Sequence, residues 1–176
     1  QLDNFEEVDL LLLSPAVRPS NPFVQAAYAR ALRVCSEVDF ARSYFAGRVV
    51  GITGSNGKTT TTLLMTELFK SAGLNAMACG NIGIPFSQIV LDNPECEVAV
   101  LELSSYQLEM SQDLDLDAGC LLNVTPDHLA RHGSFEAYVD AKLRLLEMLK
   151  PHAPLAYNQS DTALVDALQR HFTQKL

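Results

Sequence analysis

Positive charge is scarce in this sequence. It carries 13 lysine and arginine residues against 21 aspartate and glutamate residues, a formal net charge of −8 at pH 7. General binding to nucleic acids or anionic membranes needs clustered positive charge, which this composition does not supply. We therefore expect small-molecule partners, neither nucleic acid nor membrane, with any anion held by a few locally placed basic side chains.

Long apolar runs and secretory features are also missing. No apolar run reaches the ~18 residues of a membrane-spanning helix, and the first residues lack the Met, basic region and apolar core of a signal peptide. The four cysteines, Cys35, Cys79, Cys96 and Cys120, are widely spaced, which favours free thiols over disulfides or a metal site. Nine glycines and eight prolines are too few for a collagen-like or low-complexity chain. These absences predict a globular cytoplasmic protein, which we expect to be a monomer.

Short apolar runs alternate with helical patterns, which indicates the α/β class. The predicted strands span residues 9–13, 33–36, 49–53, 74–79, 98–103, 119–124 and 155–158. The predicted helices span residues 21–32, 58–72, 85–91, 104–111, 134–150 and 162–172. The run 9–13 is continuously apolar, as expected of a strand buried on both faces. The later five strands, joined by helical crossovers, predict a mainly parallel sheet with helices on both faces. Residues 37–47 are more polar, and we expect them to be irregular and to mark a domain boundary.

A glycine-rich segment, GSNGKT at residues 54–59, lies between a predicted strand and a predicted helix. Such glycines let backbone N–H groups turn toward a phosphate, and the helix N-terminus adds partial positive charge. Lys58 would reach the β- and γ-phosphates, and Thr59 would offer a hydroxyl to Mg²⁺. The segment departs from the full P-loop pattern, because Ile52 stands where its first glycine would fall. A glycine-rich turn with a solvated lysine is the alternative. The residues expected to bind nucleotide are Gly54, Ser55, Asn56, Gly57, Lys58, Thr59, Thr60 and Thr61.

Two further polar residues stand near the ends of predicted strands. Glu102 interrupts an apolar strand near its carboxyl end, and His128 follows the next strand. Ligands of open α/β sheets bind at that edge, where a carboxylate can hold Mg²⁺. The alternatives are a glutamate that faces water and a loop histidine without a role, with His132 a competitor of His128.

Lys142 falls within an apolar helical stripe. The stripe consists of Phe135, Tyr138, Val139, Leu145, Leu146 and Leu149. A lysine that extends its ammonium group to solvent and a buried functional lysine both fit this pattern, and periodicity does not choose between them.

Four motifs follow one another in the order of the Mur ligase family: GSNGKT at 54–59, GNIG at 80–83, ELSSYQLE at 102–109 and NVTPDH at 123–128. The sequence resembles this family over nearly its whole length, and the 102–109 block is most like its D-glutamate-adding branch. The resemblance implies that residues 1–47 are the C-terminal part of a Rossmann-like domain that binds a UDP-linked substrate. It further implies that residues 48–176 are an incomplete central ATP-binding domain, with the C-terminal domain absent.

The resemblance also implies a reaction. The family joins an amino acid to a carboxylate through an acyl phosphate, here D-glutamate to UDP-N-acetylmuramoyl-L-alanine, with ATP and two Mg²⁺ sites, in peptidoglycan precursor synthesis. Position by position, the implied catalytic residues are Lys58, Glu102, His128 and Lys142. The implied metal ligands are Thr59, Glu102, His128 and Lys142, the last as a carbamate. The implied substrate-binding residues are Ser14, Asn81, Ser104 and Gln107.

Two positions depart from the family pattern, since Pro126 and Ala130 stand where acidic residues are common. Without the missing domains we expect this chain alone to be inactive. Another Mur ligase or a folylpolyglutamate synthase-like ligase is one alternative, which the 102–109 block disfavours. A P-loop module without ligase activity is the other, and it gives no reason for Asn81, Gln107 and Lys142.

Overall fold

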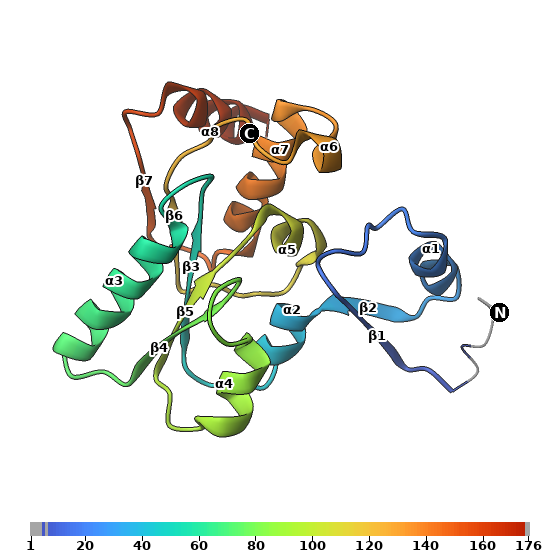
Figure 1. Ribbon diagram of the computed structural model, residues 1–176, viewed down its shortest axis with the longest axis horizontal. Coiled ribbons are helices and arrows are strands. Elements are labelled where there is room, and N and C mark those ends of the chain that lie inside the picture. Colours follow the sequence, from blue (N-terminus) through green and yellow to red (C-terminus); the bar gives the residue numbers. More distant parts are fainter. Residues whose placement is uncertain (1–4, 6, 175–176) are drawn as a thin grey trace.

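The computed structural model describes residue 5 and residues 7–174, and these residues form two parallel sheets (Figure 1). The larger sheet has five strands in the order β4-β5-β3-β6-β7. Its strands are β3 Arg48–Thr53, β4 Ala76–Gly80, β5 Val98–Glu102, β6 Ala118–Leu121 and β7 Leu155–Tyr157. The smaller sheet pairs β1 Leu10–Leu13 with β2 Arg33–Ser36. Every strand pair is parallel, which confirms the predicted sheet.

Helices connect the strands. They are α1 Pro22–Ala29, α2 Glu37–Arg42, α3 Lys58–Ser71, α4 Phe86–Asp92, α5 Ser105–Met110, α6 Leu129–His132, α7 Phe135–Leu143, a 3₁₀ helix Arg144–Met148 and α8 Thr162–Gln174. Within the described part of the chain, no helix has the length and hydrophobicity needed to cross a membrane.

The large sheet is buried on both faces. Successive strand residues point to opposite sides, so Val49 enters a core with residues of α2, α4 and α5, whereas Val50 packs with Met65 and Phe69 of α3. A third core joins α7 and α8 through Leu143 and Leu168. Helices therefore cover both faces, as predicted. The four cysteines are free thiols, three of them buried, which confirms that expectation.

Two predictions near the N-terminus are wrong. The strand β1 is not buried on both faces: Leu12 is 48% exposed, because the described helix α1 covers only one side, through Val24. Residues 37–47 are not irregular, since α2 forms there. Ser36 caps α2 by accepting a hydrogen bond from the Asp39 amide at 3.1 Å, and Ala41 packs into the main core. The domain boundary at residue 47 stays a prediction.

Two predicted helices end early. The α1 helix ends at Ala29 because the chain turns back toward β2 through Ala31, whose φ is +55°. The predicted helix 134–150 begins as expected, with Ser134 accepting from the Ala137 amide at 3.1 Å. Its α-helical part ends at Leu143, and a 3₁₀ helix continues to Met148. A 3₁₀ helix places residues i and i+3 on one side, which buries both Leu145 and Met148.

Gly80, at the end of β4, offers a test of how closely β4 and β5 approach each other at their carboxyl ends. Its φ is +98°, and an added Cβ would lie 2.5 Å from the Glu102 carbonyl oxygen. We expect Gly80→Ala to lower the free energy of unfolding by ~2–5 kcal/mol, the sum of left-handed strain and overpacking. Gly73→Ala is the matched control, because Gly73 has φ +86° but nothing within 4 Å of its added Cβ. The control should lose only ~1–2 kcal/mol in urea denaturation. Equal losses in both variants would rule out the collision as the cause.

Candidate active site

The glycine-rich loop of residues 54–57 connects β3 directly to α3. Gly57 has φ +80°, a conformation that other residues rarely adopt. Gly54 is buried against the residues that follow β6, and a Cβ there would lie 2.8 Å from the Leu122 Cβ. The loop therefore needs glycine at both positions, and it leads into the helix end whose first N–H groups lack intrahelical partners.

A second motif supports this loop from the end of β6. The Asn123 side chain accepts from the Asn56 amide at 2.8 Å and donates to the Asn56 carbonyl at 3.0 Å. The Ser55 hydroxyl accepts from the Thr125 amide at 2.9 Å and donates to the Thr125 carbonyl at 3.1 Å. The segment 123–125 thus fixes the shape of the loop, a role that sequence reasoning missed although it singled out the motif.

Two lysines meet at one carbonyl oxygen of the loop. Lys58 Nζ donates to the Gly54 carbonyl and to the Ser55 carbonyl, each at 3.0 Å. Lys142 Nζ donates to the same Gly54 carbonyl at 2.8 Å. Lys142 is 2% exposed, so the interpretation of a lysine reaching solvent is wrong. Burial, followed by the nearby charge of Lys58, lowers the pKa of Lys142 to about 7.

Tyr138 connects Lys142 to the loop. Its ring centroid lies 4.6 Å from Lys142 Nζ, and its hydroxyl lies 2.9 Å from the Ser55 hydroxyl. The ring is 1% exposed. Sequence reasoning placed Tyr138 only in the apolar stripe. Its spacing of four residues before Lys142 puts both side chains on one helix face and is the signal that could have found it.

Glu102 lies at the carboxyl end of β5, in register with Gly80 of β4 and Ile52 of β3. It is 2% exposed. One carboxylate oxygen accepts from the Thr59 hydroxyl at 2.7 Å, and the other accepts from the Asn81 amide group at 2.8 Å. No cationic side chain among the described residues forms an ion pair with it.

This donor set fits a hard divalent cation. Carboxylate and hydroxyl oxygens are ligands that Mg²⁺ prefers, and a buried carboxylate with only neutral partners favours a cation beside it. The described residues hold no cluster of three or more His, Cys, Asp or Glu side chains that could enclose a metal. A single carboxylate still suits Mg²⁺, which proteins usually bind through one or two carboxylates together with substrate phosphates.

His128 lies at the start of α6 with a left-handed φ of +52°. Its Nε2 is 3.4 Å from an Asp127 carboxylate oxygen, and the ring is half-exposed. It approaches the site through aromatic contacts, with ring centroids 5.1 Å from Tyr106 and 6.4 Å from Tyr138. His132, its competitor, hydrogen-bonds the buried Ser105 hydroxyl at 3.0 Å, and burial lowers its pKa. The structure thus assigns His132 to the contact between α5 and α6.

Three of the four predicted substrate residues line one cavity of about 550 Å³ between the two sheets. They are Ser14, Asn81 and Gln107. Ser104 lies beside them and forms a capping box with Gln107: the Ser104 hydroxyl accepts from the Gln107 amide at 3.2 Å, and the Gln107 side-chain oxygen accepts from the Ser104 amide at 3.0 Å. The capping box holds the start of α5 at the cavity wall.

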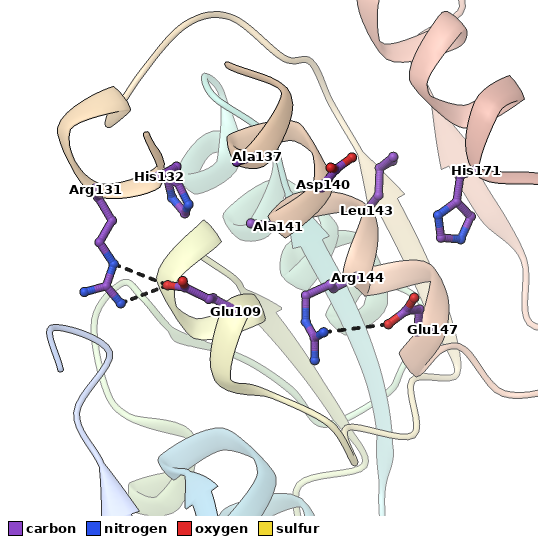
Figure 2. Close-up of a pocket in the computed structure, with 10 residues that line it drawn as sticks. All are labelled: Glu109, Arg131, His132, Ala137, Asp140, Ala141, Leu143, Arg144, Glu147 and His171. Atoms are coloured by element: carbon purple, nitrogen blue, oxygen red, sulfur yellow. Dashed lines mark hydrogen bonds and ion pairs between the residues drawn. The ribbon is translucent and has the colours of Figure 1, made fainter. Parts of the chain in front are cut away.

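A second hollow of about 480 Å³ lies around α7 and the 3₁₀ helix (Figure 2). Four of its charged side chains pair with one another: Arg131 with Glu109 at 2.8 Å, and Arg144 with Glu147 at 3.9 Å. It contains none of the residues predicted to bind nucleotide or metal. We therefore place the site at the glycine-rich loop and not in this hollow.

The fifteen residues predicted for the site fall into groups according to their contacts in the structure. Lys58 and Lys142 share the Gly54 carbonyl as acceptor. Thr59 and Asn81 share the Glu102 carboxylate. The Thr61 hydroxyl donates to the Gly57 carbonyl at 2.9 Å, within the first turn of α3. Thr60 lies exposed on that same turn.

Together, the parallel sheet, the glycine-rich strand-to-helix loop and the acidic residue on the adjacent strand define an α/β domain of the kind that binds nucleotide phosphates. The sequence matches the Mur ligase middle domain over residues 52–176. The chain belongs to the Mur ligase family.

The chain is also similar to individual named proteins of this family. A protein of Alkaliphilus metalliredigens named UDP-N-acetylmuramoylalanine–D-glutamate ligase is 45% identical over 160 residues, 90% of this chain and 35% of that protein. A protein of the same name from Desulfitobacterium hafniense is 42% identical over 97% of this chain and 37% of its own length. The crystal structure of MurF ligase from Thermotoga maritima in complex with ADP matches with a TM-score of 0.62 and 25% identity, over 95% of this chain and 47% of that chain. The chain thus spans about a third of the length of these curated relatives.

Proposed function

We propose that the protein carrying this chain is an ATP-dependent ligase that joins D-glutamate to UDP-N-acetylmuramoyl-L-alanine in peptidoglycan precursor synthesis. The identity of 45% to a ligase of that substrate class, over 90% of the chain, carries this proposal. The geometry supports the chemistry, since Lys58, Thr59 and Glu102 meet at the loop beside a cavity large enough for a substrate.

The reaction has two steps. The terminal carboxylate of the muramoyl substrate attacks the γ-phosphorus of ATP, a new P–O bond forms, and the bond to the bridging oxygen breaks to release ADP. The amine of D-glutamate then attacks the acyl carbon, the tetrahedral intermediate expels phosphate, and the nitrogen loses a proton. Both partners of the first step are anions, so Lys58, at the positive end of α3, neutralises charge as it develops on the phosphate oxygens.

Two Mg²⁺ sites belong to this proposal. The Glu102 carboxylate and the Thr59 hydroxyl would hold the first, and His128 with a carbamate on Lys142 would hold the second. Mg²⁺ at these positions supplies charge neutralisation to the phosphate groups. Asn81 orients the Glu102 carboxylate through its 2.8 Å hydrogen bond.

The nucleotide and the muramoyl substrate enter from different sides of Glu102. Residues 54–61 would hold the ATP phosphates. Ser14, Asn81, Ser104 and Gln107 would hold the UDP-linked substrate in the cavity between the sheets. Asn81 lines that cavity and also bonds Glu102, so the two substrates would meet at this pair. We further propose that the protein is a cytoplasmic monomer in which residues 1–47 and 48–176 belong to different domains.

A ligation assay on the complete polypeptide that contains these residues tests the proposal. We expect phosphate release only when ATP, UDP-N-acetylmuramoyl-L-alanine and D-glutamate are all present, with the amide product detected by mass spectrometry. The control substrates are L-lysine or meso-diaminopimelate with the acceptor UDP-N-acetylmuramoyl-L-alanyl-D-glutamate, and L-glutamate with a folate acceptor. Turnover with one of these controls instead would favour another ligase of the superfamily. Nucleotide binding without phosphate release would favour a module without ligase activity.

A further inference from the structure

One guanidinium group ties together three separate segments. Arg131, on α6, donates to the carbonyl oxygens of Ala16 at 3.2 Å and Val17 at 3.4 Å. It also pairs with the Glu109 carboxylate on α5 through Nη2 at 2.8 Å and Nε at 3.3 Å (Figure 2). Its carbon Cζ lies 4.9 Å from the ring centroid of Tyr106. The Arg131 side chain is only 8% exposed, so these contacts are largely shielded from water.

The segment 14–18 that Arg131 holds begins at one wall of the substrate cavity. Ser14 and Pro15 line that cavity. The connection is reciprocal, because Arg18 donates to the Ala130 carbonyl, next to Arg131, at 3.2 Å. Val17 packs against the small core that contains Met110 of α5. Polar and apolar contacts thus press the same segment against α5 and α6.

The opposite wall of the cavity depends on α5. Gln107 lines it, between Tyr106 and Glu109, the two α5 residues that Arg131 contacts. Arg131 therefore connects the segment 14–18, which begins at one wall, with α5, which carries Gln107 at the other. A guanidinium has five N–H donors in a rigid plane and can stack on a ring while it donates at its edge, whereas a lysine ammonium cannot do both.

We propose that Arg131 is a positioning residue for the UDP-linked substrate: it fixes the segment 14–18 against α5 and so sets the spacing of the cavity walls. This inference rests on the proposed function, which supplies the occupant of the cavity. Arg131 acts through the segment 14–18 and through α5, without touching the nucleotide loop. Its loss should therefore affect the muramoyl substrate and leave ATP almost unaffected.

The test compares Arg131→Lys with Arg144→Lys in the complete polypeptide. Arg144 is the matched control, because it also borders the hollow and holds α5, through the Leu108 carbonyl at 2.8 Å and the Ser111 carbonyl at 2.7 Å. In the described residues it has no bond to the segment 14–18. We expect Arg131→Lys to raise KM for UDP-N-acetylmuramoyl-L-alanine about 10-fold, with kcat and KM for ATP within about twofold, since charge-assisted hydrogen bonds are lost. Arg144→Lys should change each constant less than about twofold.

Hydrogen exchange gives a readout that needs no substrate. The Val17 amide donates to the Ser14 carbonyl at 2.9 Å inside the held segment. Its exchange should be faster in Arg131→Lys and unchanged in Arg144→Lys. An unchanged KM together with unchanged exchange at Val17 overturns the inference. So does a fall in kcat together with a rise in both KM values and a lower unfolding temperature, which marks a general structural role. If the wild-type protein ligates nothing but Val17 exchanges faster in Arg131→Lys, the proposed function is contradicted. The contact of Arg131 with the segment 14–18 is then still supported.

Discussion

Replacing Lys58 by alanine is expected to lower kcat for ligation by at least about 10²–10³-fold, the loss seen when one group that stabilises developing charge is removed. The lysine stands at the first residue of α3, with its ammonium group at the loop carbonyls of Gly54 and Ser55. Truncation removes positive charge from the phosphate path. It removes little packing, since Lys58 belongs to none of the hydrophobic cores.

The matched control for this prediction is Lys70→Ala on the same helix. Lys70 is exposed and pairs with Glu67, at 2.8 Å, in the last turn of α3. An exposed pair of this kind contributes ~0–1 kcal/mol to stability and should contribute nothing to turnover. Both variants should show unfolding transitions close to the wild type in circular dichroism. Normal turnover of Lys58→Ala would contradict the assignment of the glycine-rich loop to ATP binding.

The loop itself could be predicted from sequence because its chemistry is local. Gly57 and Lys58 are neighbours, and the helix that follows supplies the free N–H groups wherever the rest of the chain goes. The position of Glu102 could be predicted for a related reason. Parallel strands end at one edge of a sheet, so a residue at the end of one apolar strand lies beside the loop that follows another.

Contacts between distant segments could not be predicted in this way. Asn123 supports Asn56 across 67 residues of sequence, and this depends on the path of the chain after β6. The helix α2 was missed because six residues are too few for a periodic pattern. Its Ser36 cap and its burial against α4 decide its structure, and the second of these is a tertiary effect.

The two readings of Lys142 show the same limit at the site. The apolar stripe indicated that Lys142 faces the protein interior, but periodicity does not reveal what its nitrogen meets there. In the fold the nitrogen meets the Gly54 carbonyl, 88 residues away in sequence, and the ring of Tyr138. Only the packing of α7 on the glycine-rich loop decides between a solvated and a buried lysine.

The chemistry of the Lys142 nitrogen leads to a second expected result, a large loss of kcat in Lys142→Ala. With a pKa of about 7, roughly half of the Lys142 amines are neutral at pH 7, against about one in 3,000 for an ordinary lysine. A neutral amine can attack the carbon of CO₂: an N–C bond forms, one C–O π pair moves to oxygen, and the nitrogen releases a proton. Lys58 and Lys142 share the Gly54 carbonyl, so their two ammonium groups repel each other. The carbamate formed on Lys142 is an anion, and it would attract the Lys58 ammonium group instead.

We therefore expect a ¹³C carbamate signal when the complete polypeptide is incubated with ¹³C-bicarbonate, and we expect Lys142→Ala to abolish it. The same variant should lose at least about 10²-fold in kcat, because the second Mg²⁺ of the proposed function would lose its carbamate ligand. Formate should restore part of that activity by supplying a small carboxylate. Lys150→Ala is the control: Asp117 holds Lys150 through a 2.7 Å hydrogen bond that raises its pKa, so it stays protonated and its removal should leave the signal intact. A signal that persists in Lys142→Ala, or normal turnover of that variant, would contradict the carbamate. Lys142 would then have only a structural role, as a buried lysine that hydrogen-bonds the Gly54 carbonyl.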